Sequence, residues 1–65
     1  MKNNIKKLRN KMKISQKDLA ESLSVSRQTI NSIETGKFDP SLTLTINIIR
    51  FFKKDIQEIF IFDDE

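Results

Sequence analysis

Four polar side chains in residues 27–35 have types and spacing that suit hydrogen bonding to a nucleic acid: Arg27, Gln28, Asn31 and Ser32. Residues three or four positions apart share one face of a helix, so these side chains would project together from a helical segment. Thr29 and Lys37 lie at the flanks of that face. Side chains of these types bond to base edges and to phosphate oxygens, and the pattern therefore favours nucleic-acid recognition.

Catalytic chemistry has little support in the composition. The chain has no histidine, no cysteine and one glycine, so it lacks the commonest general bases and soft metal ligands. It also has no glycine-rich loop that could cradle a phosphate. Asp63, Asp64 and Glu65 could bind a hard cation, but a solvated acidic tail is the preferred interpretation. We expect no enzymatic activity, no metal and no cofactor.

Residues 16–23 are predicted to form the first of two helices that position this polar face. Ser15 can cap the free backbone N–H groups of this helix, and Asp18 follows three residues later, as in a capping box. Apolar residues then recur at helical spacing: Leu19, Ala20 and Leu23. The small side chain of Ala20 suits a point where two helices cross closely.

The residues Ser24, Val25 and Ser26 interrupt the helical pattern and predict a tight turn. Val25 can plug the turn, and Ser26 can cap a second helix over residues 27–35. The inward residues of that helix would be Ile30 and Ile33, and Gly36 permits a left-handed exit. Residues 16–36 therefore have the pattern of a helix-turn-helix unit.

Residues 3–60 resemble the Cro/C1-type (XRE-like) helix-turn-helix regulators of phages and bacteria. The matching segments are ISQKDLA, VSRQTINSIETGK and FDPSLTLTINIIRFF. Ser24 departs from the frequent glycine of the family, and serine can adopt the required backbone conformation at some energetic cost. The resemblance implies an all-α, five-helix, lambda-repressor-like DNA-binding domain.

The resemblance also implies roles for individual residues. Base contacts are expected from Arg27, Gln28, Asn31 and Ser32, and phosphate contacts from Gln16, Lys17, Ser26, Thr29 and Lys37. Arginine suits guanine and glutamine suits adenine in the major groove. Arg27 could instead contact phosphate, and Asn31 and Ser32 could be tolerated polar surface residues. For Glu34 a structural ion pair with a basic residue such as Arg9 is expected.

The charge of the chain is strongly asymmetric. Residues 1–38 hold nine Lys/Arg and three Asp/Glu, a net charge of +6, whereas residues 39–65 hold three Lys/Arg and six Asp/Glu, a net charge of −3. The helix-turn-helix pattern lies in the basic part. A solvated lysine face is the alternative, but together with the motif the asymmetry favours a surface that faces phosphates.

Three further helices are predicted around this unit. The first covers about residues 4–11, with an apolar stripe formed by Ile5, Leu8 and Met12. After a loop in which Phe38 is expected to fold back onto the core, Ser41 can cap a helix over residues 42–52. The core face of that helix would consist of Leu42, Thr45, Ile48, Ile49 and Phe52. The resemblance implies a left-handed conformation at Lys53, where the family often has glycine, and Asp55 can cap a short fifth helix.

Apolar residues remain beyond what so small a core needs, and they predict a dimer interface made of Leu44, Phe51, Phe60 and Phe62. The tail is open to two interpretations. Residues 59–62 favour a β-strand, which could pair with the N-terminus. Alternatively, the fifth helix continues and the last residues fray.

The preferred function is a sequence-specific, DNA-binding transcriptional regulator, a repressor that binds an inverted-repeat operator as a homodimer. The alternative is an antitoxin-like protein-interaction module, while RNA binding is disfavoured because no aromatic platform is evident. We expect one domain over residues 1–65, with the helix-turn-helix at 16–36 and a tail at 61–65. A cytoplasmic location without membrane association is expected, since no apolar stretch approaches a membrane span.

Overall fold

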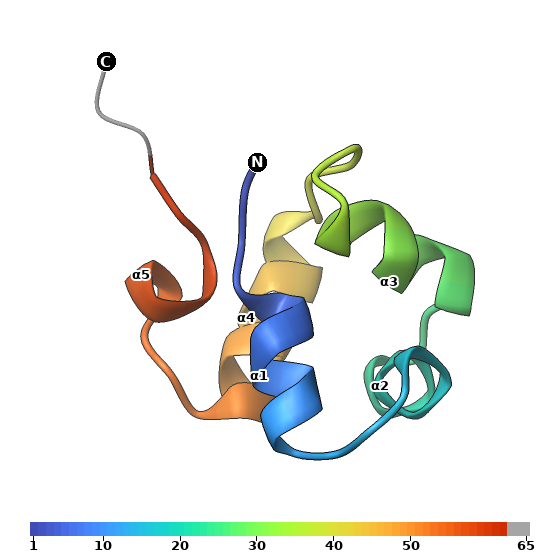
Figure 1. Ribbon diagram of the computed structural model, residues 1–65. Helices are drawn as coiled ribbons and strands as arrows, with labels where there is room; N and C mark the ends of the chain where they lie inside the picture. Colours follow the sequence, from blue (N-terminus) through green and yellow to red (C-terminus); the bar gives the residue numbers. More distant parts are fainter. Residues whose placement is uncertain (63–65) are drawn as a thin grey trace.

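The computed structural model describes residues 1–62, and five helices account for most of them. They are α1 (Ile5–Lys11), α2 (Gln16–Leu23), α3 (Arg27–Glu34), α4 (Leu42–Phe52) and α5 (Ile56–Ile59). In Figure 1, α2 and α3 lie on one side of α1, and α5 lies with the N-terminal segment on the other. Among the described helices none is long and apolar enough to cross a membrane. The expected all-α, five-helix fold is confirmed.

One hydrophobic core receives side chains from all five helices. Its largest fully buried members are aliphatic: Ile5, Leu19, Ile30, Ile33, Ile48 and Ile59. Ala20 is 3% exposed at the crossing of α2 and α3, as its small size predicted. Burying a side chain of the isoleucine size contributes roughly 1.5–3 kcal/mol, so these few residues supply most of the stabilisation of so short a chain.

Serine side chains cap three of the helices. The hydroxyl oxygens of Ser15, Ser26 and Ser41 each accept a hydrogen bond from the backbone N–H three residues later, at 3.0–3.1 Å. Asp18 completes a capping box by accepting the backbone N–H of Ser15 at 3.0 Å. This hydrogen bond, followed by the one to the Ser15 side chain, lowers the pKa of Asp18 below its usual value. The three predicted serine caps are confirmed. Asp55, the fourth predicted cap, is the N-cap residue of α5, and its backbone N–H donates to Glu58 Oε1 at 3.0 Å.

Within residues 1–62, three residues other than glycine adopt left-handed backbone conformations: Lys13 (φ 60°), Ser24 (φ 58°) and Lys53 (φ 56°). Ser24 ends α2 and opens the turn to α3, and Lys53 ends α4, as expected from their positions. Gly36 leaves α3 at φ 80°, where glycine carries no steric penalty. Lys13 was not anticipated, because nothing in its type or spacing marks a left-handed residue.

Three apolar residues predicted to join the core are exposed instead. Met12 is 48% exposed because α1 has ended and the chain turns away at Lys13. Leu42 is 77% exposed because it opens α4 beyond the end of the core, where Ile48 and Phe52 of the same helix are buried. Phe38 is 51% exposed because the loop after α3 holds it on the outer side of that helix.

The tail pairs with the N-terminus through a single antiparallel bridge between Asn3 and Phe60. The backbone N–H of Asn4 donates to the carbonyl of Ile59 at 2.7 Å, and that of Ile61 donates to Lys2 at 2.9 Å. The alternative that α5 continues through the tail is wrong. Within residues 1–62 the pairing is limited to this one bridge, and no strand of several residues forms. The predicted acidic tail at residues 63–65 lies outside the described residues.

A buried ion pair joins α1 to α3, as predicted for Glu34. The Nε of Arg9 lies 2.8 Å from Glu34 Oε2, and Arg9 Nη2 donates to Glu34 Oε1 at 3.3 Å. The two side chains are only 9% and 3% exposed. Arg9 Nη1 also donates to the carbonyl of Ile14 at 2.9 Å, which fixes the connection between α1 and α2.

Replacing Ser24 by glycine should stabilise the fold. Glycine removes about 1–2 kcal/mol of left-handed strain from the folded state. It also has more conformational freedom in the unfolded state, which costs roughly 0.5–1 kcal/mol of stability. The free energy of unfolding should therefore rise by about 0.5–1 kcal/mol. Urea denaturation measures the difference. Ser22→Gly, in the ordinary helical part of α2, is the control and should lower stability; an equal loss in both variants would contradict the strain at Ser24.

Glu34→Gln should lower the free energy of unfolding by about 3 kcal/mol or more, because it leaves the Arg9 charge buried without its partner. The loss should change little between low and high salt. Asp39→Asn is the matched control, since Asp39 pairs with the N-terminal amine at 3.0 Å on the exposed surface and should matter by less than about 1 kcal/mol. Equal, salt-sensitive losses in the two variants would contradict this account.

Candidate nucleic-acid interface

The turn between α2 and α3 is compact and internally bonded. Ser24 takes the left-handed conformation, and the backbone N–H of Val25 donates to the carbonyl of Ala20 at 3.0 Å. Val25 is half-buried and packs against the core. The helices α2 and α3 pack against each other, and the small Ala20 of α2 is buried.

The four candidate base-contact residues occupy that outer face of α3. Arg27 and Gln28 are the first two residues of the helix and are exposed, as is Asn31, while Ser32 is half-buried. The inner face carries Ile30 and Ile33, both fully buried. Burial of these two isoleucines fixes the rotation of α3 about its axis, so the polar face has one orientation.

Gln16, the first residue of α2, is bonded to α3. Its Nε2 donates to Asn31 Oδ1 at 3.1 Å and to Glu34 Oε1 at 3.0 Å. The sequence pattern had suggested phosphate binding for Gln16 but gave no sign of this link, because the two segments are joined only by the fold. The amide ties the N-terminus of α2 to the outer face of α3 and to the buried ion pair.

The candidate phosphate contacts lie around the same face. Ser26 caps α3, and its Oγ lies 2.8 Å from Thr29 Oγ1, so the two hydroxyls form one cluster at the helix N-terminus. Lys17 on α2 and Lys37 after α3 are exposed. The N-termini of α2 and α3 add free backbone N–H groups and a partial positive charge, which favour anions.

Phe38 was expected in the core but borders this polar face. A hollow of about 270 Å³ beside α3 is lined by Ser26, Gln28, Thr29, Ser32 and Phe38. The backbone N–H groups of Lys37 and Phe38 both donate to the carbonyl of Ser32, at 3.0 and 3.2 Å, and close the loop over the end of α3. The loop therefore keeps Phe38 on the outer side of α3, whose inner side is filled by Ile33.

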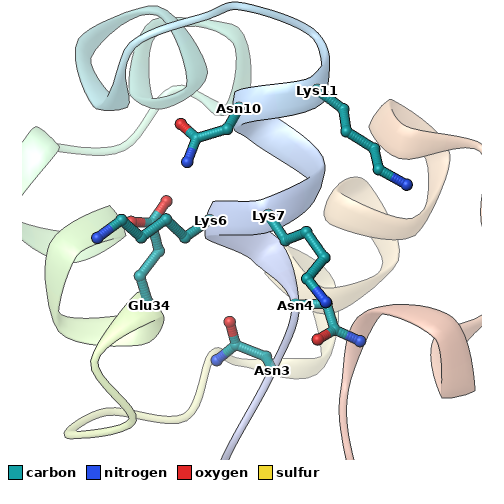
Figure 2. Close-up of a pocket in the computed structure, with 7 residues that line it drawn as sticks. All are labelled: Asn3, Asn4, Lys6, Lys7, Asn10, Lys11 and Glu34. Atoms are coloured by element: carbon teal, nitrogen blue, oxygen red, sulfur yellow. The ribbon is translucent and has the colours of Figure 1, made fainter.

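A second, wider hollow of about 680 Å³ lies along α1 and is strongly basic (Figure 2). Figure 2 shows its lining residues: Asn3, Asn4, Lys6, Lys7, Asn10, Lys11 and Glu34. Two of the asparagines serve the fold, since Asn3 Nδ2 donates to the Ile33 carbonyl at 2.8 Å and Asn4 Nδ2 to that of Glu58 at 3.0 Å. The lysines are exposed and extend the positive surface of the N-terminal half.

The candidate dimer residues are placed differently from one another. Leu44 and Phe51 are half-buried against the core, and Phe60 is 3% exposed, so a contact through Phe60 would require the core to open. Phe62 is 47% exposed. It borders an apolar hollow of about 270 Å³ lined by Met1, Asp39, Pro40, Leu42, Thr45, Ile56, Phe60 and Phe62. Leu42 and Ile56 line the same hollow but were not among the candidate dimer residues, because both fit helix faces that could equally be buried.

Comparison with known proteins identifies the family. A family model described as helix-turn-helix matches residues 5–59. The chain is 51% identical over 65 residues to an uncharacterized HTH-type transcriptional regulator of Methanocaldococcus jannaschii. The aligned region covers 100% of this chain and 98% of the relative. It is 38% identical over 65 residues to the uncharacterized HTH-type transcriptional regulator YgzD of Bacillus subtilis, with coverage of 100% and 98%.

A third relative, an uncharacterized HTH-type transcriptional regulator of Archaeoglobus fulgidus, is 45% identical over 65 residues and covers 100% of this chain and 92% of the relative. These matches agree with the helix-turn-helix geometry of α2 and α3, and the resemblance predicted from the sequence is confirmed. The chain belongs to the Cro/C1-type helix-turn-helix family of DNA-binding transcriptional regulators.

Proposed function

We propose that the protein binds a specific inverted-repeat DNA site as a homodimer and represses transcription there. The observation that carries this proposal is the single, fixed orientation of the polar face of α3, with Arg27 and Gln28 at its N-terminal end. The N-terminal residues of such a helix reach base edges when the helix enters the major groove. As a regulator of transcription it would act in the cytoplasm, where the DNA is.

The residues around α3 divide into two roles in this proposal. Arg27, Gln28, Asn31 and Ser32 read bases. Gln16, Lys17, Ser26, Thr29 and Lys37 bind phosphates and thereby set the position of α3 on the duplex. Both N–H groups of Gln16 Nε2 are already donated, one to Asn31 and one to Glu34. A phosphate bound by this amide would have to take one of these N–H groups, so its binding would be coupled to the orientation of Asn31 or Glu34.

For the dimer we propose the apolar hollow bordered by Leu42, Ile56 and Phe62 as the contact with a second copy. These side chains are 77%, 39% and 47% exposed, so a partner would remove substantial apolar area from water. In Figure 1, α5 lies across α1 from α2, which leaves the outer face of α3 free for DNA. A two-fold symmetric pair would present two α3 helices to successive major grooves, about 34 Å apart.

A protein-interaction module of the antitoxin type is the second candidate. The same exposed apolar hollow supports it, because that surface could receive a different protein. The polar face of α3 argues for DNA as the primary ligand. Repression would follow from occupying a site that RNA polymerase needs, and a contact that recruits polymerase would instead give activation.

Selection of bound DNA from a random duplex pool should enrich an inverted repeat with half-sites about one helical turn apart. Arg27→Ala and Gln28→Ala should each weaken binding to the selected site by roughly 5- to 150-fold, which corresponds to about 1–3 kcal/mol, and should relax one base preference. Gln57→Ala, on exposed α5, is the control and should change neither. Weak, salt-sensitive binding without an enriched sequence would contradict the proposal.

Leu42→Ser should convert the dimer to a monomer in sedimentation experiments, because it places a polar group in the centre of the proposed contact. Its 77% exposure makes a loss of folding unexpected. The variant should keep its affinity for a single half-site and lose affinity for the full inverted repeat. Met12→Ser, at a 48% exposed residue at the end of α1, is the matched control. Identical oligomeric states for Leu42→Ser and the unmodified protein would argue against this interface.

A further inference from the structure

Phe38 is a half-exposed aromatic ring in a fixed position. Its backbone N–H donates to the Ser32 carbonyl at 3.2 Å, and that of Gly36 donates to Ile33 at 3.0 Å. On its other side Asp39 Oδ1 accepts the N-terminal amine at 3.0 Å. The loop is thus tied at both ends, and yet Phe38 remains 51% exposed.

The ring lies beside groups that would face DNA. The hollow beside Phe38 is otherwise lined by residues of the polar face of α3 and by candidate phosphate contacts: Ser26, Gln28, Thr29 and Ser32. The hollow is therefore polar on its α3 side and apolar at the Phe38 ring. Phe38 does not line the apolar hollow proposed for the dimer, although its neighbours Asp39 and Pro40 do. A second copy bound there would leave the ring uncovered.

The major groove offers one apolar group that such a ring can recognise. Thymine carries a C5-methyl group there, and apolar side chains, phenylalanine among them, contact it. We infer that Phe38 packs against the methyl group of one thymine in each half-site. The inference rests on the proposed function, and it assigns a base-reading role to the loop after α3 in addition to α3 itself.

The energetic effect should be that of burying one methyl group. Transfer of one such carbon from water to an apolar surface changes affinity by roughly threefold to fivefold. The contact would distinguish thymine from uracil and cytosine, which lack the methyl group, at a single position. The hydroxyls of Ser26 and Thr29 lie beside the same hollow, but they are bonded to each other at 2.8 Å and do not compete with the Phe38 ring for the thymine methyl group.

The test uses the full chain and its selected DNA site, in which each thymine is replaced in turn by deoxyuridine. For the unmodified protein, one replacement per half-site should weaken binding roughly threefold to fivefold. Phe38→Ala removes the contact from both subunits, so it should weaken binding to the thymine site by roughly 9- to 25-fold and be indifferent to that replacement. Met12→Ala, an exposed apolar residue on α1, is the matched control and should behave as the unmodified protein does. An unchanged melting temperature of Phe38→Ala establishes that the fold is intact.

The outcomes separate this inference from the function on which it rests. If no sequence is selected, the proposed function fails and the inference with it. If a site is selected but Phe38→Ala responds to every deoxyuridine replacement as the unmodified protein does, only the role of Phe38 is overturned. A uniform loss of affinity in Phe38→Ala, independent of the base, would also overturn it, because that result indicates a contact with the sugar-phosphate backbone.

Discussion

The buried ion pair between Arg9 and Glu34 is the constraint on which the arrangement of the first three helices depends. Two charges that are 9% and 3% exposed must be paired and hydrogen-bonded, since a lone buried charge costs several kcal/mol. The geometry leaves little freedom: Arg9 also holds the Ile14 carbonyl, and Glu34 also holds Gln16. The pair therefore sets where α2 begins and how α3 lies against α1, in a chain with no cysteine to cross-link them.

This constraint reaches the proposed DNA-binding surface through Gln16. Its amide nitrogen bonds both to the buried carboxylate of Glu34 and to the exposed Asn31. The interior of the protein and its polar surface are consequently parts of one hydrogen-bonded network. A helix that reads bases has to be held firmly, because a small rotation would misplace every hydrogen bond that it offers. The network, together with burial of Ile30 and Ile33, supplies that rigidity without a large core.

Two surfaces with different chemistry carry exposed apolar groups. Phe38 stands among hydroxyl and amide groups beside α3, whereas Leu42, Ile56 and Phe62 form an apolar hollow with the N-terminus. A single aromatic ring among polar groups suits a ligand whose surface is polar apart from one apolar group. A contiguous apolar patch suits another protein surface. The division would leave separate surfaces for DNA and for the second copy that we propose.

The sequence by itself determined the local structure. Serine caps and the apolar spacing placed α2 and α4 at their observed bounds, because these signals act between residues a few positions apart. Only the tertiary structure decided which apolar residues are covered. Phe38 and Leu42 have the same hydrophobicity inside or outside a core, and their exposure depends on where the helices end and what already fills the space. The link from Gln16 to Asn31, between separate helices, likewise has no signature in the sequence.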